Sequence, residues 1–364
     1  MKAGIVGLPN VGKSTLFNCL SNARAQSANF PFCTIEPNIG VVNVPDPRLK
    51  VLETLVHPER VVPATVEIVD IAGLVKGASK GEGLGNQFLG NIRETDAIIH
   101  VLRCFDDDNV VHVDGSVDPI RDKETIDIEL QLKDLETVEK KLDKVKRAAR
   151  TGDKDAQKEE VALDKVKTGL ESGTSVRAIE LSEDDRIDYI KPLQLLTDKP
   201  VLYVCNVDES SAVEGNAYVE LVEEAAKNED AEVIFLAVGV EADIAELEDY
   251  EERQLFLEDL GLSEPGSSKL IRRAYQLLNR QTYFTAGVKE VRAWTIPIGA
   301  TAPQAAGVIH TDFEKGFIRA EVIKYEDYIA YQTEAKVREA GKIGVEGKEY
   351  VVQDGDIMHF RFNV

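Results

Sequence analysis

The chain has 364 residues, of which 43% are hydrophobic, and it carries a formal net charge of −22 at pH 7. This length allows two or three domains with ordinary hydrophobic cores. The negative charge excludes nonspecific binding to nucleic acid or anionic lipid, so DNA is not an expected partner and any contact with RNA requires a local basic patch.

The cysteines and the apolar runs indicate the compartment. The four cysteines are scattered without C-x-x-C spacing, as is typical of reduced thiols. No run of about 18 uncharged apolar residues exists, so no membrane span is expected. The chain begins directly with an expected strand and shows no signal peptide. These features predict a cytoplasmic protein.

A phosphate-binding loop is predicted within the first fifteen residues. The segment from Gly7 to Ser14 reads GLPNVGKS and fits the pattern G-x-x-x-x-G-K-[ST]. We expect a short buried strand over 3–6 and the first turns of a helix over 15–20. In that context backbone N–H groups point at phosphate oxygens. Lys13 is expected to reach the β- and γ-phosphates, and the Ser14 hydroxyl to coordinate Mg²⁺.

Two later segments fit the switch regions of a nucleotide-hydrolysing protein. A predicted strand over 66–70 ends in the sequence DIAG, the D-x-x-G pattern, in which Asp70 would hold Mg²⁺ through water and the Gly73 N–H would contact the γ-phosphate. Thr34 is the candidate hydroxyl that completes Mg²⁺ coordination, with an ordinary turn threonine as the alternative. The glycine-rich run 73–85 suits a segment ordered by the γ-phosphate, although a plain flexible loop also fits.

The predicted secondary structure changes along the chain. Central strands are predicted over 66–70 and 97–102, and again over 200–205 and 232–237. Between these pairs, apolar residues at helical spacing predict two antiparallel helices, either a coiled-coil-like arm or an ordinary helical insertion. From Tyr283 the pattern is β-rich. We expect an α/β fold with a discontinuous nucleotide-binding domain over 1–127 and 199–280, a helical insertion over 128–198 and a small α+β domain over 281–364.

The segment expected to read the base follows the strand that ends at Cys205. A guanine-specific site reads N-K-x-D, and its aspartate accepts two hydrogen bonds that only guanine supplies. Here Asn206 is followed by Val207 in place of the lysine and by Glu209 in place of the aspartate. The guanine preference is therefore lost and adenine becomes the favoured base. A strand-end turn without base contact is the alternative.

With these motifs, the chain resembles the YchF/Obg-like ATPase family of P-loop proteins. The matching stretches span essentially the whole chain and are Gly4–Asn18, Asn29–Asn38, Asp70–Asn86, Tyr283–Trp294 and His310–Ala320. The resemblance implies a P-loop domain, an inserted helical domain and a C-terminal β-grasp TGS domain. It also implies ATP preference and association with the ribosome, with the large subunit and its RNA as the expected contact.

The resemblance also implies roles for individual residues. Ser14 and Thr34 would be Mg²⁺ ligands, and Asn206 and Val207 would form the adenine-contacting segment. The implied phosphate binders are Asn10, Val11, Gly12, Lys13, Ser14 and Thr15.

The hydrolysis machinery is expected to be unusual. The position after D-x-x-G, where many switch GTPases carry a water-orienting glutamine, is Leu74. His112 lies in the loop after a central strand, where loops face the nucleotide. The resemblance also points to a catalytic histidine there, while a surface histidine is the alternative. Lys13 and Gly73, from the P-loop and D-x-x-G patterns, are the other residues expected to act in hydrolysis. Asn10 suggests a second source of catalysis, a K⁺ ion beside the phosphates, and a purely structural asparagine is equally open.

A basic patch on the arm completes the candidate sites. Its members are Lys133, Lys140, Lys141, Lys144, Lys146, Arg147 and Arg150. Such a patch can meet ribosomal RNA phosphates, and a solvated helix face is the alternative. The favoured function is an Mg²⁺-dependent ATPase that hydrolyses ATP to ADP and phosphate and acts as a nucleotide-controlled ribosome-binding switch. The alternatives are an Obg-type GTPase and a non-catalytic RNA- or ribosome-binding module with a structural nucleotide.

Overall fold

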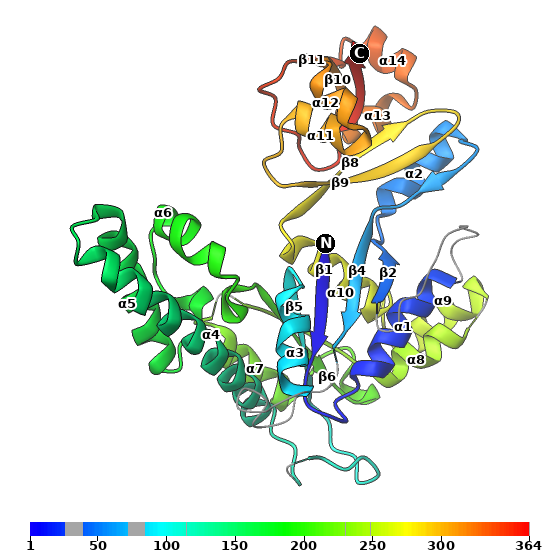
Figure 1. The fold of residues 1–364 in the computed structure, drawn as a ribbon. Helices are drawn as coiled ribbons and strands as arrows, with labels where there is room; N and C mark the ends of the chain where they lie inside the picture. The colour runs from blue at the N-terminus through cyan, green and yellow to red at the C-terminus, as the bar shows by residue number, and fades with distance from the viewer. Residues whose placement is uncertain (26–38, 72–83, 114, 230, 248, 364) are drawn as a thin grey trace. The chain divides into compact units, whose positions relative to one another are not determined.

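The computed structural model describes residues 1–25, 39–71, 84–113, 115–229, 231–247 and 249–363 (Figure 1). The chain divides into two compact units. The first comprises Met1–Val41 and Glu67–Leu270, and the second comprises Val42–Val66 and Ile271–Val364. Among the helices within the described ranges, none is long and apolar enough to cross a membrane.

A six-stranded sheet forms the centre of the first unit, with strand order β2-β4-β1-β5-β6-β7. Its strands are β1 (Lys2–Val6), β2 (Ile39–Asn43), β4 (Thr65–Asp70), β5 (Ala97–Arg103), β6 (Val201–Asn206) and β7 (Glu232–Leu236). The pairings from β4 through β7 are all parallel. Every residue of β5 and β6 is buried, as expected for central strands of a parallel sheet. The carboxyl ends of these strands share one edge, where such sheets bind ligands.

Helices pack on this sheet in two groups. In one group α1 contacts α8, and in the other α4 contacts α7 and β5 (Figure 1). The helices of the unit outside the arm are α1 (Lys13–Ala25), α3 (Leu84–Arg93), α7 (Ala217–Ala226), α8 (Val238–Glu246) and α9 (Tyr250–Asp259), and α10 (Gly266–Leu277) begins in this unit and continues into the second. Together the sheet and these helices form the α/β fold expected of a P-loop domain.

The helical arm consists of α4 (Pro119–Ala149) and α5 (Lys154–Glu171), which pack along each other through an apolar core that includes Leu142, Leu163 and Val166. The helical region was predicted to begin at about residue 128, and in the structure it begins earlier, at Pro119. Asp118 caps α4 through the amides of residues 120 and 121, and Pro119 occupies the first helical position. The return to β6 runs through η1 (Val176–Ala178), α6 (Glu183–Asp185), η2 (Arg186–Ile190), η3 (Lys191–Leu193) and η4 (Leu196–Asp198).

The second unit contains its own six-stranded sheet, with order β11-β10-β12-β8-β9-β3. Its elements are α2 (Pro47–Val56), β3 (Val61–Val62), β8 (Arg280–Ala286), β9 (Val291–Pro297), α11 (Ala302–Ile309), α12 (Thr311–Lys315), β10 (Phe317–Ile323), α13 (Tyr325–Tyr331), α14 (Glu334–Glu339), β11 (Gly344–Glu346) and β12 (Ile357–Phe362). The hairpin β8–β9 is antiparallel, and β12 lies parallel to β8 between β8 and β10. With α11 packed on this sheet, the topology is that of a β-grasp fold, in agreement with the expected TGS domain.

Residues 42–66 belong to this second unit, although in the sequence they lie between the P-loop and D-x-x-G. They form α2 and the short strand β3, whose Val61 and Val62 pair with Val291 and Arg292 of β9. A two-residue strand has almost no sequence signature, because its formation depends on the pairing partner.

Candidate functional site

The phosphate loop connects β1 to α1 at the carboxyl edge of the first sheet. Gly12 has a φ of 98°, which disfavours residues with a side chain, and a Cβ at this position would lie 2.6 Å from Asn206 Nδ2. Asn10 also adopts a left-handed conformation, with a φ of 62°. The Gly12 carbonyl accepts the first helical hydrogen bond, from the Leu16 amide. The predicted phosphate binders from Asn10 to Thr15 therefore surround the N-terminus of α1, which attracts anions.

Lys13 lies folded back over this loop. Its side chain is buried, with 8% of the residue exposed, and Nζ donates a hydrogen bond to Leu8 O at 2.8 Å. Burial lowers the pKa of Lys13 to about 8, and the nearby Asp70 carboxylate partly opposes this effect. The ammonium thus has a neutral carbonyl as its hydrogen-bond partner at a position where a phosphate would provide an anionic one.

Asp70 and Ser14 meet at the end of β4 and the start of α1. Ser14 Oγ lies 3.5 Å from Asp70 Oδ2, while Asp70 Oδ1 is buried without a hydrogen-bond partner in the described structure. Burial raises the pKa of Asp70, and the positive charge of Lys13 opposes the shift. A hydroxyl beside a carboxylate with an unused oxygen matches the oxygen ligands that Mg²⁺ prefers.

Some of the predicted switch residues cannot be placed. Thr34, Gly73 and Leu74 lie outside the described residues. Within the described ranges, no group of three or more His, Cys, Asp and Glu side chains is arranged to hold a metal ion.

Asn206 connects the P-loop with the segment predicted to contact the base. Its Nδ2 donates to Val11 O, and its Oδ1 accepts from the Val238 amide, each at 3.0 Å. The following Val207 is buried, and its amide donates to Leu236 O. The structure therefore brings the P-loop together with the ends of β6 and β7, and both groups of the Asn206 amide side chain are engaged in holding them.

The two acidic residues after Val207 differ in their environment. The Asp208 carboxylate accepts a hydrogen bond from the Ser211 amide at 3.0 Å and so caps η5 (Glu209–Ser211). Glu209 opens this short helix and is exposed. The Asp208 carboxylate is thus used in the local fold.

His112 is buried rather than exposed on its loop. The residue is 7% exposed, and its Nε2 lies 2.7 Å from Oδ2 of Asp122 in the first turn of α4. The preceding residue touches the P-loop, because Asn10 Nδ2 donates to Val111 O at 3.1 Å. The loop is therefore next to the phosphate site, while the imidazole is bound to the arm. Asp122 could not be predicted from the sequence, since no motif links a helix residue to a loop residue ten positions away.

A buried polar network joins the arm to the sheet, and it too was missed. Lys123 Nζ donates to Asp127 at 2.8 Å and to Glu229 at 2.5 Å, and Arg177 donates to Glu229 and to the Tyr203 hydroxyl. Burial lowers the pKa of the neighbouring His100 to about 3, so this imidazole is neutral. The network is structural, because it fixes the base of α4 to β6 and to Glu229, which follows α7 in the chain.

The predicted basic patch on the arm is partly neutralised. Four of its seven members form ion pairs, namely Lys133, Lys140, Lys141 and Lys146. Lys144, Arg147 and Arg150 are exposed near the end of α4 and make no ion pair within the described residues. We refer to these three residues as the arm-end cluster. It is the part of the patch that can still attract phosphates.

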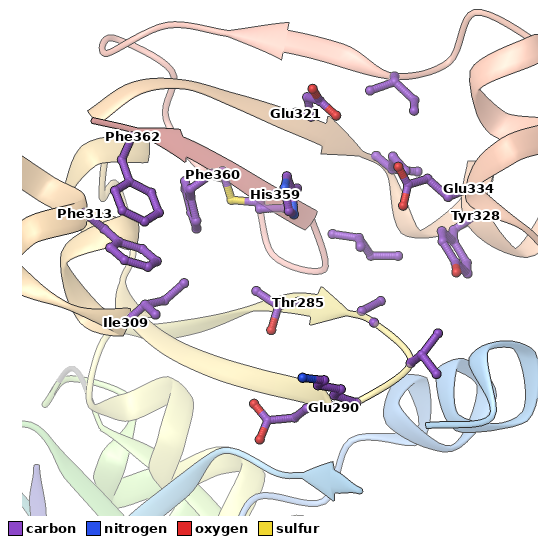
Figure 2. A pocket seen from close by; sticks show the side chains of 18 residues that line it. Thr285, Glu290, Ile309, Phe313, Glu321, Tyr328, Glu334, His359, Phe360 and Phe362 are labelled. Atoms are coloured by element: carbon purple, nitrogen blue, oxygen red, sulfur yellow. The ribbon is translucent and has the colours of Figure 1, made fainter. Parts of the chain in front are cut away.

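A groove of about 570 Å³ lies on the second unit (Figure 2). β8 and β12 pair at Phe284 and Ile357, and the groove lies alongside these strands, with Thr285 on the β8 side. Phe313 and Phe362 stack at its end with ring centroids 3.7 Å apart. The glutamates that line it are paired with arginines, in the pairs Arg60–Glu290, Arg338–Glu321 and Arg338–Glu334. The groove is mainly apolar and is a poor match for nucleic-acid phosphates.

The phosphate loop after β1, the aspartate at the end of β4 and the parallel sheet define the class of P-loop nucleoside triphosphatases. Comparison with known proteins supports the same class. Residues 2–146 match a family model described as a 50S ribosome-binding GTPase. Residues 280–363 match the C-terminal model of YchF GTPases, which is described as a protein of unknown function.

Full-length relatives and a solved structure identify the family. The chain is 59% identical over 363 residues to proteins named Ribosome-binding ATPase YchF from Haemophilus ducreyi and Escherichia coli O157:H7, covering 100% of this chain and 99% of each relative. It is 56% identical to the Bacillus subtilis protein of that name, over the whole length of both. The structure of the Schizosaccharomyces pombe YchF GTPase superposes with a TM-score of 0.89 at 41% identity, covering 99% of this chain and 97% of that one. This chain belongs to the YchF family.

Proposed function

We propose that this protein is an Mg²⁺-dependent ATPase that hydrolyses ATP to ADP and phosphate, and that the bound nucleotide controls its attachment to the ribosome. The observation that carries the choice of ATP is the segment after β6. Asn206 holds it against the P-loop, and it presents Val207 and Glu209 where a guanine site requires lysine and aspartate. The names of the bacterial relatives support the ATPase activity and the association with the ribosome.

An Obg-type GTPase is the second candidate. The family model of the first domain and the S. pombe structure both carry the word GTPase. The replacement of the aspartate by Glu209 and of the lysine by Val207 argues against guanine, because the Glu209 carboxylate lies one methylene further from the backbone than the aspartate that accepts both guanine N–H groups.

The hydrolysis site is assigned to residues around the P-loop. Ser14 and Thr34, with Asp70 through water, would hold Mg²⁺, which neutralises charge on the phosphates when bound. Lys13 would release the Leu8 carbonyl and bind the β- and γ-phosphate oxygens, and the Gly73 N–H would contact the γ-phosphate. Asn206, Val207 and Glu209 form the base segment.

Water must be oriented by another group, because Leu74 has no hydrogen-bonding side chain. His112 is the proposed group, since its loop contacts the P-loop through Asn10 and Val111. A K⁺ ion held beside Asn10 is the alternative source of charge stabilisation.

The arm-end cluster is the proposed RNA contact, with ribosomal RNA of the large subunit as its partner. Its three positive charges are exposed and free of ion pairs within the described residues, on a chain that is otherwise strongly acidic. Such a local patch can bind a phosphate backbone although the net charge is unfavourable.

Single-turnover ATP hydrolysis tests the site. Lys13→Ala and Ser14→Ala are expected to abolish hydrolysis while the protein stays folded, and undiminished activity of Lys13→Ala would refute the P-loop assignment. His112→Ala is expected to bind ATP nearly normally and to hydrolyse it at least tenfold more slowly, about 1.4 kcal/mol of transition-state stabilisation. Leu74→Ala serves as the matched control, since it removes no catalytic hydrogen bond. A parental rate in His112→Ala would favour Asn10 with K⁺.

A further inference from the structure

The burial of His112 and of its two neighbours is the opposite of what their polarity predicts. The imidazole is buried against Asp122, whereas the two flanking valines are turned to solvent, Val111 with 75% and Val113 with 53% of its surface exposed. Large apolar side chains normally occupy the buried positions and a polar ring the exposed ones. Something other than hydrophobic burial therefore determines which way this segment faces.

The backbone before His112 is held in place independently of its ring. Arg103, which is almost fully buried, donates to the carbonyls of Phe105, Asp107 and Val110. Asn10 of the P-loop holds the carbonyl of Val111. The attachment of the loop beside the phosphate site thus does not depend on the imidazole, which contacts Asp122 of α4.

The Asp122 carboxylate is a buried hydrogen-bond acceptor with a fixed orientation. It is 1% exposed, and its second oxygen, Oδ1, accepts from Arg121 Nε at 3.2 Å and Nη2 at 3.0 Å. It lies in the first turn of α4, where the helix dipole favours a carboxylate. Oδ2 is then directed at His112 Nε2 at 2.7 Å, a short, charge-assisted distance.

We propose that Asp122 is a latch that holds His112 against α4 in the resting protein, and that hydrolysis requires the imidazole to exchange this hydrogen bond for one in the nucleotide site. The inference rests on the proposed role of His112 in hydrolysis. Asp122 is a positioning residue that acts through His112. In the resting protein the released state is a minor population, and any partner that favours release is expected to accelerate hydrolysis.

The direction in which one substitution changes the hydrolysis rate tests the latch. Asp122→Asn keeps the shape of the side chain and removes its charge, so the single-turnover rate is expected to rise at least fivefold while the Kd for ATP is unchanged. Asp122→Glu, which restores the carboxylate, is expected to return the rate toward the parental value. The double variant Asp122→Asn/His112→Ala is expected to be as slow as His112→Ala alone. Asp118→Ala is the matched control: it weakens the start of α4 without touching His112, and its rate is expected to stay parental.

The experiments distinguish a failure of the latch from a failure of the proposed catalytic role of His112. If His112→Ala hydrolyses ATP at the parental rate, the proposed catalytic role of His112 is wrong. If His112→Ala is slow and Asp122→Asn is also slower than the parent, Asp122 orients the histidine for catalysis and the latch is refuted. The unmodified protein supplies a measurement that is independent of variant folding, a structure with Mg²⁺, ADP and aluminium fluoride bound. The account requires the His112–Asp122 bond to be broken there, and an intact bond would overturn it.

Discussion

Lys13 illustrates how burial of a single residue prepares a phosphate site. Its ammonium lies under the loop with the Leu8 carbonyl as its acceptor, and the lost hydration lowers its pKa to about 8. Phosphate oxygens of a bound nucleotide would favour the charged form and raise this pKa again. The free and bound proteins therefore differ in protonation above pH 8, whereas below that pH Lys13 is protonated in both.

This difference predicts the pH dependence of nucleotide binding. Above pH 8 binding should take up a proton at Lys13, so that ATP affinity falls as pH rises, by up to tenfold per pH unit. Calorimetric titrations at pH 8.5 in buffers of different ionisation enthalpy should reveal the uptake, and the same titrations at pH 6.5 provide the control. Binding at pH 8.5 without proton uptake would contradict the assigned state of Lys13.

The sequence predicted where the candidate site residues lie only at positions that belong to a motif. Gly12, Lys13, Ser14 and Asp70 meet at the carboxyl edge of the sheet because the P-loop and D-x-x-G patterns prescribe their strand ends. The partner of His112 was not predictable, because Asp122 reaches it only through the path of the loop between β5 and α4.

At the scale of elements, the buried strands were predicted well and the irregular return from the arm was not. The expected strands over 66–70, 97–102, 200–205 and 232–237 correspond closely to β4, β5, β6 and β7, because fully buried parallel strands appear as continuous apolar runs. The short helices from η1 to η4 have no such run. Their position depends on side chains of α4, above all on Asp134.

Asp134 should be essential for the attachment of the arm. It is fully buried on α4 and accepts hydrogen bonds from the Leu196 amide, the Thr197 amide and the Thr197 hydroxyl at 2.7–2.8 Å. Asp134→Ala would leave these donors unpaired, at a cost of about 3 kcal/mol or more. Hydrogen exchange at the two amides should accelerate correspondingly. Asp143→Ala, at an exposed position of the same helix, should stay within about 0.5 kcal/mol, and equal effects of the two substitutions would contradict this role.

At the scale of the whole molecule, the composition predicted an acidic protein but not where a positive surface remains. Internal ion pairs neutralise part of the predicted basic patch, so that among the described residues the arm-end cluster is the part that keeps its positive charge unpaired. The participation of residues 42–66 in the second unit was likewise invisible, because it depends on the pairing of β3 with β9.

The arm-end cluster predicts how ribosome binding responds to charge. Arg147→Glu should weaken co-sedimentation with large ribosomal subunits at least threefold at about 0.1 M salt and should reduce the salt dependence of binding. Lys227→Glu makes the same change of charge at the exposed C-cap of α7 and should have little effect. Equal losses in both variants would mean that net charge, and not the arm, governs the association.

The measurement that tests the central claim most directly is a parallel calorimetric titration of the protein with ATP and with GTP in the presence of Mg²⁺. Val207 and Glu209 follow Asn206 where guanine recognition needs lysine and aspartate. The account predicts that ATP binds at least tenfold more tightly than GTP, a difference of about 1.4 kcal/mol or more. Binding of GTP as tight as, or tighter than, that of ATP would contradict it.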